Sequence, residues 1–529
     1  MSSKPFLLGL DQGTSGSRAL ILDREGQVRG YGYRSLARLY PQSGWVEQDP
    51  DAVVAGVAEA IAEAMHHAGC RPAEIAACGI ACQRNTDFIW DARARRPIAN
   101  AITWQDLRTL SLVGELAGWS QAGQRRRRLG TFPGPYSSSM HLAWRMRYDP
   151  EVAAAVRAEY TRIGFSAAWL LAAMGQPTGH AMDYSLIQAM GLYDFRAECY
   201  WQEWLDALHI PPAPLPQAVP TIHDFGTLRL TASTGVAANV PVLAMLGDQQ
   251  AALFGYDCRH PGDTECTLGT ASFVKVCLGP HAPESDKINI YFAWSLPMIN
   301  DHRPPTAASQ SKIQNRLSVN GEKSKIVHTY CLEAETAATG SAIRWMQEHA
   351  RFIDHYTDVG PLAASVPDSA GVVFVPAFTG LFVPYNDQTA RGTILGLTLG
   401  STRAHIVRAF VEALAFQVRA ILATIEAETK LQIELLKLGG GVAASNEICQ
   451  IMADLLGIPL IRPAFTETTA RAAAMLAGLG AGVWPNMAGL PPLPGDYITF
   501  EPRLSADQRD AAHAQWQRAV ERATSWSEG

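Results

Sequence analysis

The chain has 529 residues, of which 47% are hydrophobic and 18% charged, a composition typical of a globular protein with more than one buried core. Lysine and arginine number 44 and aspartate and glutamate 50, so the formal net charge is −6. This mildly acidic balance gives no general attraction to nucleic acid or to an anionic membrane, and neither is expected as a partner.

No segment of the chain predicts membrane insertion, secretion or a disulfide framework. The longest uninterrupted apolar stretch, 472–484, is shorter than the roughly 20 residues that cross a bilayer. The first residues do not combine an apolar segment with a small-residue cleavage site. The nine cysteines form no CxxC pair, and their odd number argues against a disulfide framework. We therefore expect a reduced, soluble, cytoplasmic protein.

The first part of the chain alternates apolar runs with a helical pattern. The runs FLLGL and RALILD flank a polar segment, DQGTSGS, which predicts strand, tight turn and strand. Asp49 is placed to cap a helix that begins at Pro50 and ends at Gly69. Two further apolar strands, IAACGIAC and TDFIWD, follow. Such alternation predicts an α/β layered fold.

The middle of the chain repeats the opening pattern. A proline-rich stretch, 211–220, is interpreted as a connector, and the apolar run VPVLAML then leads through a polar turn into a helix near Gln250. The segment 264–279 again predicts strand, small-residue turn and strand. Because the two strand–turn–strand units lie about half a chain apart, we expect two domains of related architecture, 1–255 and 256–529.

Four other segments have simpler interpretations. The basic run Arg125–Arg128 is expected to form a solvated surface turn, and the polar segment 281–328 an extended surface excursion. A strand, a glycine-rich turn and a helix that Gly457 closes are expected near the C-terminus. Before them, a long amphipathic helix is predicted over 402–430, with Ile406, Phe410, Leu414, Ile421 and Ile425 on its buried side.

The turn after the first strand has the composition that phosphate binding needs. Converging backbone N–H groups bind phosphate oxygens where small residues let the backbone approach closely. Arg18 offers a charge-assisted hydrogen bond, and Asp11 is placed to hold Mg²⁺ through water. A plain β-hairpin remains the alternative for this turn alone, but LGTASF repeats the pattern in the second half. The turn residues are Gly13, Thr14, Ser15 and Gly16.

Asp248 lies where an apolar strand runs out into a turn. Polar residues at such strand ends line the ligand crevice of α/β folds. A carboxylate at this place can accept the proton of a hydroxyl that attacks phosphorus, and Gln249 can hydrogen-bond a neighbouring hydroxyl. The alternative is that Asp248 caps the following helix, and the two roles are compatible.

Other polar groups also follow apolar strands. Arg84, Asn85 and Trp104 suit a hydroxyl-rich ligand, although Trp104 taken alone is more commonly a core residue. The glycine run 439–441 would either seat an adenosine or only turn the chain. The sequence has no GxxxxGK[ST] motif and no GxGxxG at the start of a helix, which argues against a P-loop enzyme and a dinucleotide dehydrogenase.

The motifs LDQGTSGSRALILD, GWVEQDP, GDQQAALFG, VPAFTGL and ARGTILGLT resemble the FGGY family of carbohydrate kinases, and within it the members that phosphorylate glycerol. The resemblance runs from about Leu7 to Trp526 and is poorest at 281–328. It implies two actin/hexokinase-like (ribonuclease H-like) α/β domains around a central cleft. It also implies transfer of a phosphoryl group from ATP, with Mg²⁺, to a hydroxyl of a small polyol or sugar. A homo-oligomer, either dimer or tetramer, is expected.

The resemblance further implies roles for single residues. Asp248 falls on the position of the catalytic base. The polyol site is implied at Arg84, Tyr136, Asp248 and Gln249, with Trp104 and Phe273 as apolar walls. The first phosphate turn takes Thr14, Ser15, Gly16 and Arg18. The nucleotide positions are Thr270, Gly340, Arg344, Gly441 and Ser445.

Several residues depart from the family pattern. Asn85 stands where the glycerol pocket of the family carries a glutamate. Hydrogen bonds to charged groups contribute about 1.5–3 kcal/mol and neutral ones about 0.5–1.5, so the change should weaken hydroxyl binding by about 1 kcal/mol, roughly tenfold. Arg344 and Ser445 replace the usual glutamine and asparagine. Asn239 replaces an arginine of a sugar-bisphosphate effector site, so feedback of that kind is not expected.

Two alternatives to a glycerol-phosphorylating enzyme follow from these departures. The first is a kinase of the same family for another polyol or a ketose, such as erythritol, xylulose or ribulose. The second is a non-catalytic sensor of a nucleotide or sugar on the same architecture.

Overall fold

A computed structural model describes residues 4–232, 234–285, 287–297, 326–336 and 338–527, and these form two compact units. The first unit takes its residues from 1–257, 291–330 and 467–494, and the second from 258–290, 331–466 and 495–529. Both units are discontinuous in sequence. The two contiguous domains expected from the sequence, 1–255 and 256–529, stay a prediction. In the part of the chain that the structure describes, no helix is long and apolar enough to cross a membrane.

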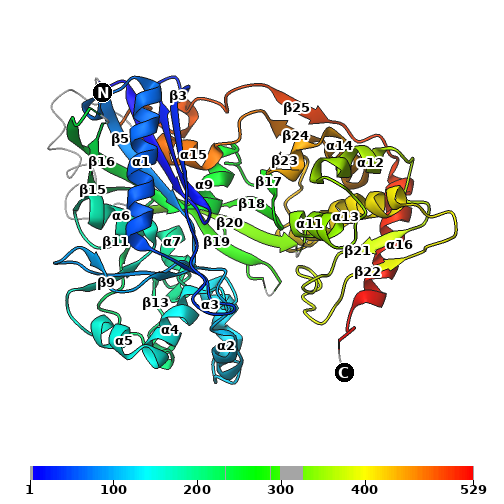
Figure 1. Ribbon diagram of the computed structural model, residues 1–529, viewed down its shortest axis with the longest axis horizontal. Helices are drawn as coiled ribbons and strands as arrows, with labels where there is room; N and C mark the ends of the chain where they lie inside the picture. The colour runs from blue at the N-terminus through cyan, green and yellow to red at the C-terminus, as the bar shows by residue number, and fades with distance from the viewer. Residues whose placement is uncertain (1–3, 233, 286, 298–325, 337, 528–529) are drawn as a thin grey trace. The chain divides into compact units, whose positions relative to one another are not determined.

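The first unit is built on a seven-stranded sheet in the order β10-β15-β16-β5-β1-β2-β3 (Figure 1). The three central strands, β16, β5 and β1, are parallel to one another, and the outer pairs are antiparallel. Every residue of β5 is buried, as expected for a strand covered on both faces. The strands are β1 (Phe6–Gln12), β2 (Gly16–Leu22), β3 (Val28–Ser35), β5 (Ile75–Cys82), β10 (Gly175–Pro177), β15 (Ile222–Thr231) and β16 (Ala237–Gly247).

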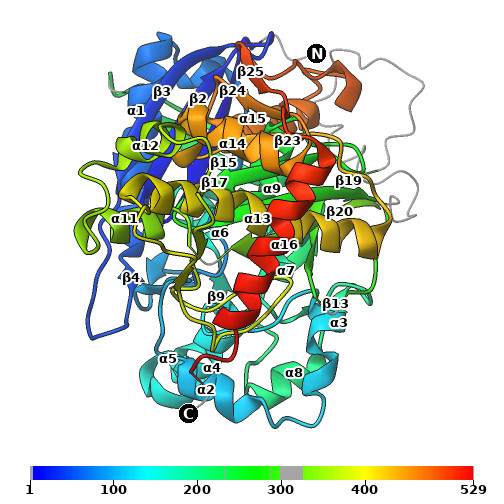
Figure 2. The ribbon, with the colours of Figure 1, turned by 90° about the vertical axis from the view of Figure 1, so that its right-hand side faces the viewer.

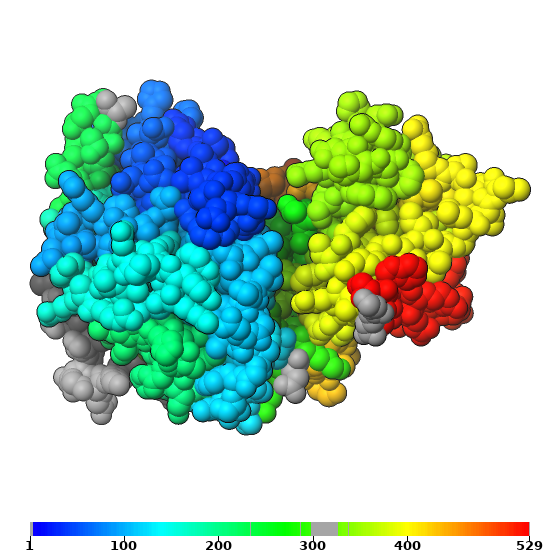
Figure 3. Space-filling view, turned by 60° about the horizontal axis from the view of Figure 1, so that its bottom comes forward, coloured from blue at the N-terminus to red at the C-terminus, as the bar shows by residue number. Residues whose placement is uncertain are grey.

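Helices cover this sheet, and shorter strands and helices extend it. Helix α1 packs on β2 and β3, and α15 packs on β1, β5 and β16. Helices α2 and α4 pack together, and the light-blue and cyan segments that hold them lie side by side on the surface in Figure 3. The helices are α1 (Pro50–Ala68), α2 (Leu110–Leu116), α3 (Arg125–Leu129), α4 (Ser138–Tyr148), α5 (Pro150–Val156), α6 (Ser166–Met174), α7 (Tyr184–Ala189), α8 (Gln202–Ala207), α9 (Asp248–Gly255) and α15 (Thr468–Gly480), with short 3₁₀ turns at Pro72–Glu74, Ala122–Gln124 and Met487–Gly489. The small strands are β4 (Glu47–Gln48), β6 (Phe88–Asp91), β7 (Arg96–Pro97), β8 (Ala101–Ile102), β9 (Thr161–Gly164), β11 (Ala181–Asp183), β12 (Tyr193–Asp194), β13 (Cys199–Tyr200) and β14 (Gln217–Val219).

Helix α15 approaches the sheet so closely that only glycine fits beneath it. A Cβ atom on Gly9 of β1 would lie 1.9 Å from the carbonyl oxygen of Ala470, and a Cβ on Gly79 of β5 would lie 1.9 Å from that of Ala473. Real Cβ atoms do not come this near to backbone oxygens. The missing side chains therefore let the backbone of α15 rest directly on the two central strands, and the segment 467–494 becomes part of the first unit.

A second seven-stranded sheet, in the order β19-β20-β18-β17-β23-β24-β25, lies mostly in the second unit, although residues 291–297 of β19 and 326–330 of β20 belong to the first unit. The long helix α13 packs against α12, α14 and α16 (Figure 2). Between α13 and α16, the centres of the Phe416 and Trp516 rings lie 5.7 Å apart. The strands are β17 (Thr264–Leu268), β18 (Ser272–Gly279), β19 (Asn289–Pro297), β20 (Ile326–Thr336), β21 (Val373–Val375), β22 (Thr393–Leu395), β23 (Leu436–Gly439), β24 (Leu460–Pro463) and β25 (Tyr497–Phe500). The helices are α11 (Gly340–Glu348), α12 (Val359–Ala364), α13 (Arg403–Thr429), α14 (Asn446–Leu456) and α16 (Ala506–Ala523), with 3₁₀ turns at Tyr356–Asp358 and Val442–Ala444.

The elements predicted from local patterns are confirmed. Both strand–turn–strand units form antiparallel hairpins, β1–β2 and β17–β18. Asp49 caps α1 and accepts a hydrogen bond from the backbone N–H of Asp51 at 2.9 Å. Gly69 ends this helix and Gly457 ends α14, both in the left-handed region, with φ of 61° and 75°.

The interpretation of Arg125–Arg128 as a solvated surface turn is wrong. These residues form most of helix α3, and Arg125 is only 3% exposed. Its guanidinium lies 5.0 Å from the centre of the Phe132 ring. Arg128 donates a hydrogen bond of 2.6 Å to Asp194. Aromatic rings and a carboxylate, rather than water, surround two of the four charges.

Two other expectations also need correction. The segment 281–328 is not a surface excursion throughout, because β19 carries a continuous buried run over 290–295; residues 298–325 lie outside the described part of the chain. In α13, Phe410, Leu414, Ile421 and Ile425 are buried as predicted, whereas Ile406 is only half-buried.

The contact between α15 and the sheet predicts the effect of a single added methyl group. Gly79→Ala should lower the free energy of unfolding by about 1–3 kcal/mol, because the new Cβ forces the two backbones apart. Gly56→Ala, on α1, is the matched control. Its new Cβ would meet only the Arg34 side chain, at 3.7 Å, and alanine favours a helix. Urea denaturation measures both variants. Equal stability of Gly79→Ala and the native protein would contradict the packing described here.

Candidate active site

The three central strands of the first unit end at the same level. Gln12 of β1 pairs with Cys82 of β5, and Cys82 pairs in turn with Gly247 of β16. The carboxyl ends of parallel strands form the usual ligand-binding edge of an α/β sheet. The residues next to these positions include three that the sequence singled out, Asp11, Arg84 and Asp248.

Asp248 is the first residue of α9, and its carboxylate is half-buried. Its Oδ1 accepts a hydrogen bond of 2.7 Å from the backbone N–H of Gln249 and lies 3.9 Å from Nε of Arg84. Gly247, not Asp248, occupies the cap position of α9. The helix-capping alternative for Asp248 is therefore wrong, and its side chain is held beside a guanidinium instead.

The Arg84 side chain lies against an aromatic ring and passes over a glycine. Its guanidinium lies 4.9 Å from the centre of the Tyr291 ring, within the range of a cation–π interaction. A Cβ atom on Gly247 would lie 3.1 Å from Cδ of Arg84, so glycine at this position gives the arginine stem its room. The charge of Arg84 is thereby placed next to Asp248.

The first small-residue turn is supported by a chain of buried glutamine side chains. Gly13 donates its backbone N–H to the carbonyl oxygen of Gly16 at 3.0 Å, which closes the turn. Gln83 donates to Gln48 at 2.8 Å, and Gln48 donates to the carbonyl oxygen of Thr14 at 2.9 Å. These side chains orient the turn from beneath, and their role is one that the sequence analysis missed.

Asp11 lies in a charged cluster beside the same turn. Arg18 reaches Oδ2 of Asp11 at 3.4 Å and Oε2 of Glu467 at 3.3 Å. Burial raises the pKa of Asp11 to about 7 in spite of Arg18, and the charges of Asp248 and Glu467 raise it further. Glu467, at the start of α15, is a second residue that sequence reasoning missed, because only the fold brings it to the turn.

The carboxylates of Asp11 and Asp248 fit a magnesium ion that is held mainly by other ligands. Within the described residues, no group of three or more His, Cys, Asp or Glu side chains is placed to hold a metal. Mg²⁺ keeps several waters and is commonly bound by one or two carboxylates together with substrate phosphates. Burial is the main cause of the raised pKa of Asp11, and the charge of Asp248 adds to it, so the two carboxylates are near enough to suit such a cation.

The remaining polyol-site candidates of the first unit lie on loops that contact these strand ends. Trp104 is 40% exposed, and its indole N–H donates to the Thr14 hydroxyl at 2.8 Å, so it is not a core residue. Asn85 accepts a hydrogen bond of 3.4 Å from the backbone N–H of Ser138. Tyr136, two residues before Ser138, is 38% exposed and donates to the carbonyl oxygen of Phe132 at 3.3 Å. Ser15 is exposed at the tip of the turn.

The second unit brings the start of α11 against the second small-residue turn. Gly340 donates its backbone N–H to the carbonyl oxygen of Gly269 at 2.9 Å, and a Cβ on Gly340 would lie 2.8 Å from that oxygen. Thr270 is exposed at the tip of the turn, and Arg344 is exposed on the next turn of α11. Phe273, predicted as a polyol wall, lies on β18 of this unit and is half-buried.

The glycine-rich turn that follows β23 reaches the same strand end. Gly440 has a φ of 87°, and a Cβ there would lie 2.4 Å from the carbonyl oxygen of Leu268. Gly441 is exposed, with nothing within 4 Å of a built Cβ. Ser445 caps α14 and donates to Glu447 at 2.7 Å. The turns that hold Thr270, Gly340 and Gly441 therefore converge on the end of β17.

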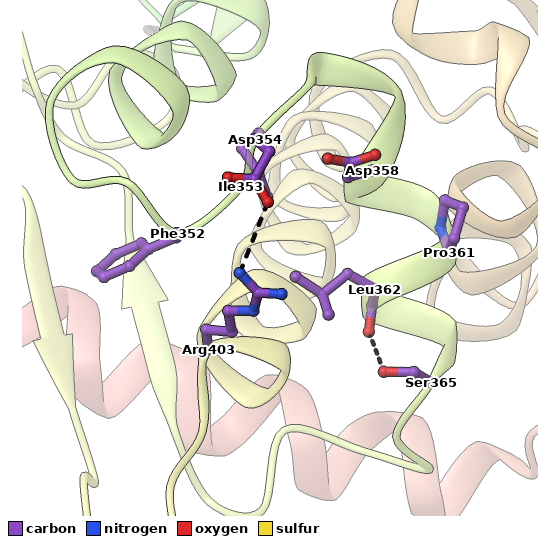
Figure 4. A pocket seen from close by; sticks show the side chains of 8 residues that line it. All are labelled: Phe352, Ile353, Asp354, Asp358, Pro361, Leu362, Ser365 and Arg403. Carbon is purple, nitrogen blue, oxygen red and sulfur yellow. Dashed lines mark hydrogen bonds and ion pairs between the residues drawn. The ribbon is translucent and has the colours of Figure 1, made fainter.

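A separate pocket of the second unit lies on α12 and the start of α13 (Figure 4). Arg403 and Asp354 approach within 3.9 Å across it. None of the predicted nucleotide residues lines it, so it is not part of the candidate site. Its lining residues are Phe352, Ile353, Asp354, Asp358, Pro361, Leu362, Ser365 and Arg403.

The raised pKa of Asp11 predicts that removing its charge increases the stability of the fold, by an amount that depends on pH. Burial raises the pKa from 3.8 to about 7, so between these values the unfolded chain binds fewer protons than the folded one, and stability falls as the pH rises. Asp11→Asn should therefore be more stable than the native protein above about pH 7, and the gain should vanish towards about pH 4. Urea denaturation without divalent metal measures it.

Asp387 of the second unit is a control, because its pKa is shifted in the opposite direction to that of Asp11. Hydrogen bonds from the Thr389 hydroxyl and the backbone N–H of Ser525 lower the pKa of Asp387. Its carboxylate stabilises the fold above its unfolded pKa and loses that contribution in acid. Asp387→Asn should thus lose stability at neutral pH. A stability difference for Asp11→Asn that does not change with pH would contradict the electrostatic account.

The sequence and the fold were compared with known proteins. The N-terminal and C-terminal domain models of the FGGY family of carbohydrate kinases match residues 6–255 and 302–481. The chain is 36% identical over 526 residues to a glycerol kinase of Symbiobacterium thermophilum, covering 99% of both chains. It is 38% identical over 522 residues to a glycerol kinase of Aromatoleum aromaticum, covering 98% of this chain and 99% of the relative.

The structure is similar to that of Plasmodium falciparum glycerol kinase with ADP, with a TM-score of 0.85, 24% identity and 98% of both chains covered. The fold of this chain is accordingly the two-domain α/β fold expected from the motifs. With family models that match most of its length and relatives above 30% identity over nearly all of it, the chain belongs to the FGGY family of carbohydrate kinases.

Proposed function

We propose that this kinase transfers the γ-phosphoryl group of ATP to glycerol and forms glycerol 3-phosphate. The observation that carries the proposal is the carboxylate of Asp248, which lies at the ligand-binding edge of the first sheet, 3.9 Å from Arg84. The names of the relatives at 36% and 38% identity support glycerol as the acceptor.

In the proposed mechanism, Asp248 accepts the proton of the glycerol hydroxyl as its oxygen attacks phosphorus. General-base catalysis of this kind contributes about 10²–10⁴-fold. The backbone N–H of Gln249 fixes one carboxylate oxygen of Asp248, and the guanidinium of Arg84 lies 3.9 Å from that oxygen. Arg84, Asn85, Tyr136 and Gln249 would hydrogen-bond the glycerol hydroxyls, and Trp104 would pack on its carbon chain.

The phosphates would be bound by the turn that contains Thr14, Ser15 and Gly16, with Arg18 as a charge-assisted donor. Asp11, with Asp248 nearby, would hold Mg²⁺ through water, and the ion would neutralise phosphate charge when bound. The nucleotide would lie on Thr270, Gly340, Arg344, Gly441 and Ser445 of the second unit.

The setting of the reaction is also part of the proposal. None of the nine cysteines, all of which lie in the described part of the chain, forms a disulfide bond, and eight of them are buried. This fits a reducing compartment, so we place the enzyme in the cytoplasm. We further propose that it acts as a homo-oligomer, a dimer or a tetramer.

Asp248→Asn tests the proposed base. The amide keeps the size of the side chain but cannot accept the proton, so kcat should fall at least about a hundredfold. Coupled detection of ADP measures turnover, and calorimetry with an ATP analogue should give unchanged nucleotide affinity. Asp23→Asn, at the far end of β2, is the matched control and should keep full activity. Near-normal turnover of Asp248→Asn would remove the base assignment.

A second candidate function is suggested by Asn85, whose neutral amide meets Ser138 where the glycerol pocket of the family has a carboxylate. Because a neutral amide forms weaker hydrogen bonds with the glycerol hydroxyls than a carboxylate does, the acceptor would instead be another polyol or a ketose. Assays with glycerol, erythritol, xylulose and ribulose distinguish the two functions, and a strong preference for any but glycerol would overturn the first. Tight polyol binding without ADP formation would instead indicate a sensor.

Asn85→Glu tests whether this position tunes the acceptor. A charged acceptor should strengthen hydroxyl binding by about 1 kcal/mol and lower KM for glycerol roughly tenfold, with kcat nearly unchanged. Asn85→Gln has the length of glutamate without its charge and is the control. An equal effect of both variants would mean that side-chain length, not charge, governs acceptor affinity.

A further inference from the structure

The backbone just before Asp248 is held by a side chain from a different part of the first unit. Gly247, the cap residue of α9, donates its N–H to the Ser185 hydroxyl oxygen at 3.0 Å. Ser185 lies on α7 and is fully buried. Because the N–H groups at a helix start have no partner inside the helix, this hydroxyl determines where α9, and with it Asp248, begins.

Ser185 is itself held by Asp183, a fully buried carboxylate. The Ser185 hydroxyl donates to Oδ1 of Asp183 at 2.8 Å, which leaves its oxygen to accept from Gly247. Oδ1 also accepts from the backbone N–H of Leu186 at 3.0 Å, and Oδ2 accepts from the Thr221 hydroxyl at 2.9 Å. Each of these partners is a donor, so the arrangement requires the carboxylate in its ionised form.

The far side of this network is anchored to strand β19. The Thr221 hydroxyl oxygen accepts the backbone N–H of Ser295 at 2.9 Å. Both groups are fully buried, so water cannot replace any of these hydrogen bonds. Asp183 is therefore fixed on two sides, and Ser185 has one orientation that satisfies both Asp183 and Gly247.

We propose that Ser185 and Asp183 are positioning residues of the reaction: the Ser185 hydroxyl, oriented by Asp183, sets the place of the Asp248 carboxylate relative to the attacking hydroxyl. Neither residue touches substrate in this proposal. The inference rests on Asp248 acting as the proposed base, and it adds that the base is placed by a buried contact on the peptide before it.

The electrostatics of Asp183 are consistent with this arrangement. Burial raises the pKa of Asp183 to about 6, against hydrogen bonds from Leu186, Ser185 and Thr221 that lower it. The carboxyl group is thus mostly ionised at neutral pH, the state in which it accepts all three hydrogen bonds. Asp183 and Asp248 are both close enough to the buried thiol of Cys82 for their charges to raise its pKa.

Ser185→Ala tests the proposal directly. The variant leaves the N–H of Gly247 without its acceptor but keeps the cap that Asp183 makes for α7. Misplacing a catalytic group by a fraction of an ångström should lower kcat about tenfold to a hundredfold, while KM for glycerol and ATP stays within about twofold. Thr161→Val is the matched control, since it removes a buried hydroxyl hydrogen bond from β9 of the same unit, and its kcat should not change.

Asp183→Asn provides a second test that does not depend on Ser185. Its amide oxygen can still accept from the Ser185 hydroxyl and the N–H of Leu186, but its NH₂ group presents donors to the Thr221 hydroxyl, which donates to Asp183 in the native protein. The anchor of Asp183 is thereby disturbed, so kcat should fall, though less than in Ser185→Ala, again without a change in KM. Asp149→Asn is its control, because Asp149 caps the similar short helix α5 through the backbone N–H of Val152. A loss of kcat in Asp183→Asn but not in Asp149→Asn separates positioning from helix capping.

Several outcomes would overturn the inference. Native kcat in folded Ser185→Ala, a KM that rises in step with the loss of kcat, or two variants that both fail to fold would each reduce Ser185 and Asp183 to a structural role. Failure of the proposed function looks different. In that case Asp248→Asn itself keeps its turnover, whereas failure of this inference alone leaves Asp248→Asn inactive and Ser185→Ala active.

Discussion

The parallel register of β1, β5 and β16 is the constraint on which the candidate site depends. Gln12, Cys82 and Gly247 are paired across three neighbouring strands, so the residues beside them emerge at one edge of the sheet. Segments that are far apart in sequence thereby contribute a carboxylate, a guanidinium and a second carboxylate to one place. A shift of one residue in either pairing would turn these side chains to the opposite face.

The same edge concentrates charge that the fold alone does not favour. The charges of Asp248 and Glu467 both raise the pKa of Asp11. Arg18 forms ion pairs with Asp11 and Glu467, and Arg84 lies beside Asp248. Burial is the main cause of the raised pKa of Asp11, about 7, and the charges of Asp248 and Glu467 add to it. Clusters of perturbed carboxylates are typical of catalytic sites, since a cation or a cationic ligand relieves the repulsion.

Much of the fold follows from local sequence, and the motifs also predict which residues belong to the candidate site. The hairpin β1–β2 and the helix from Pro50 to Ala68 were predictable because strand alternation, caps and small-residue turns are encoded within a few residues. The side chains that support the site were not. Glu467 and Ser185 reach it only through packing between distant segments, and nothing in their neighbouring residues indicates that contact. The burial of Arg125 has a similar origin, since its guanidinium lies 5.6 Å from the centre of the ring of Trp204, which comes from the distant helix α8.

The return of residues 467–494 to the first unit has a consequence for how the protein is made. Helix α15 rests on the glycines of β1 and β5, yet the ribosome synthesises it only after most of the second unit. Until then the nascent chain displays the apolar surface of its two central strands uncovered. The N-terminal half therefore cannot complete its core during its own synthesis, and a fragment that ends near residue 255 would be prone to aggregate.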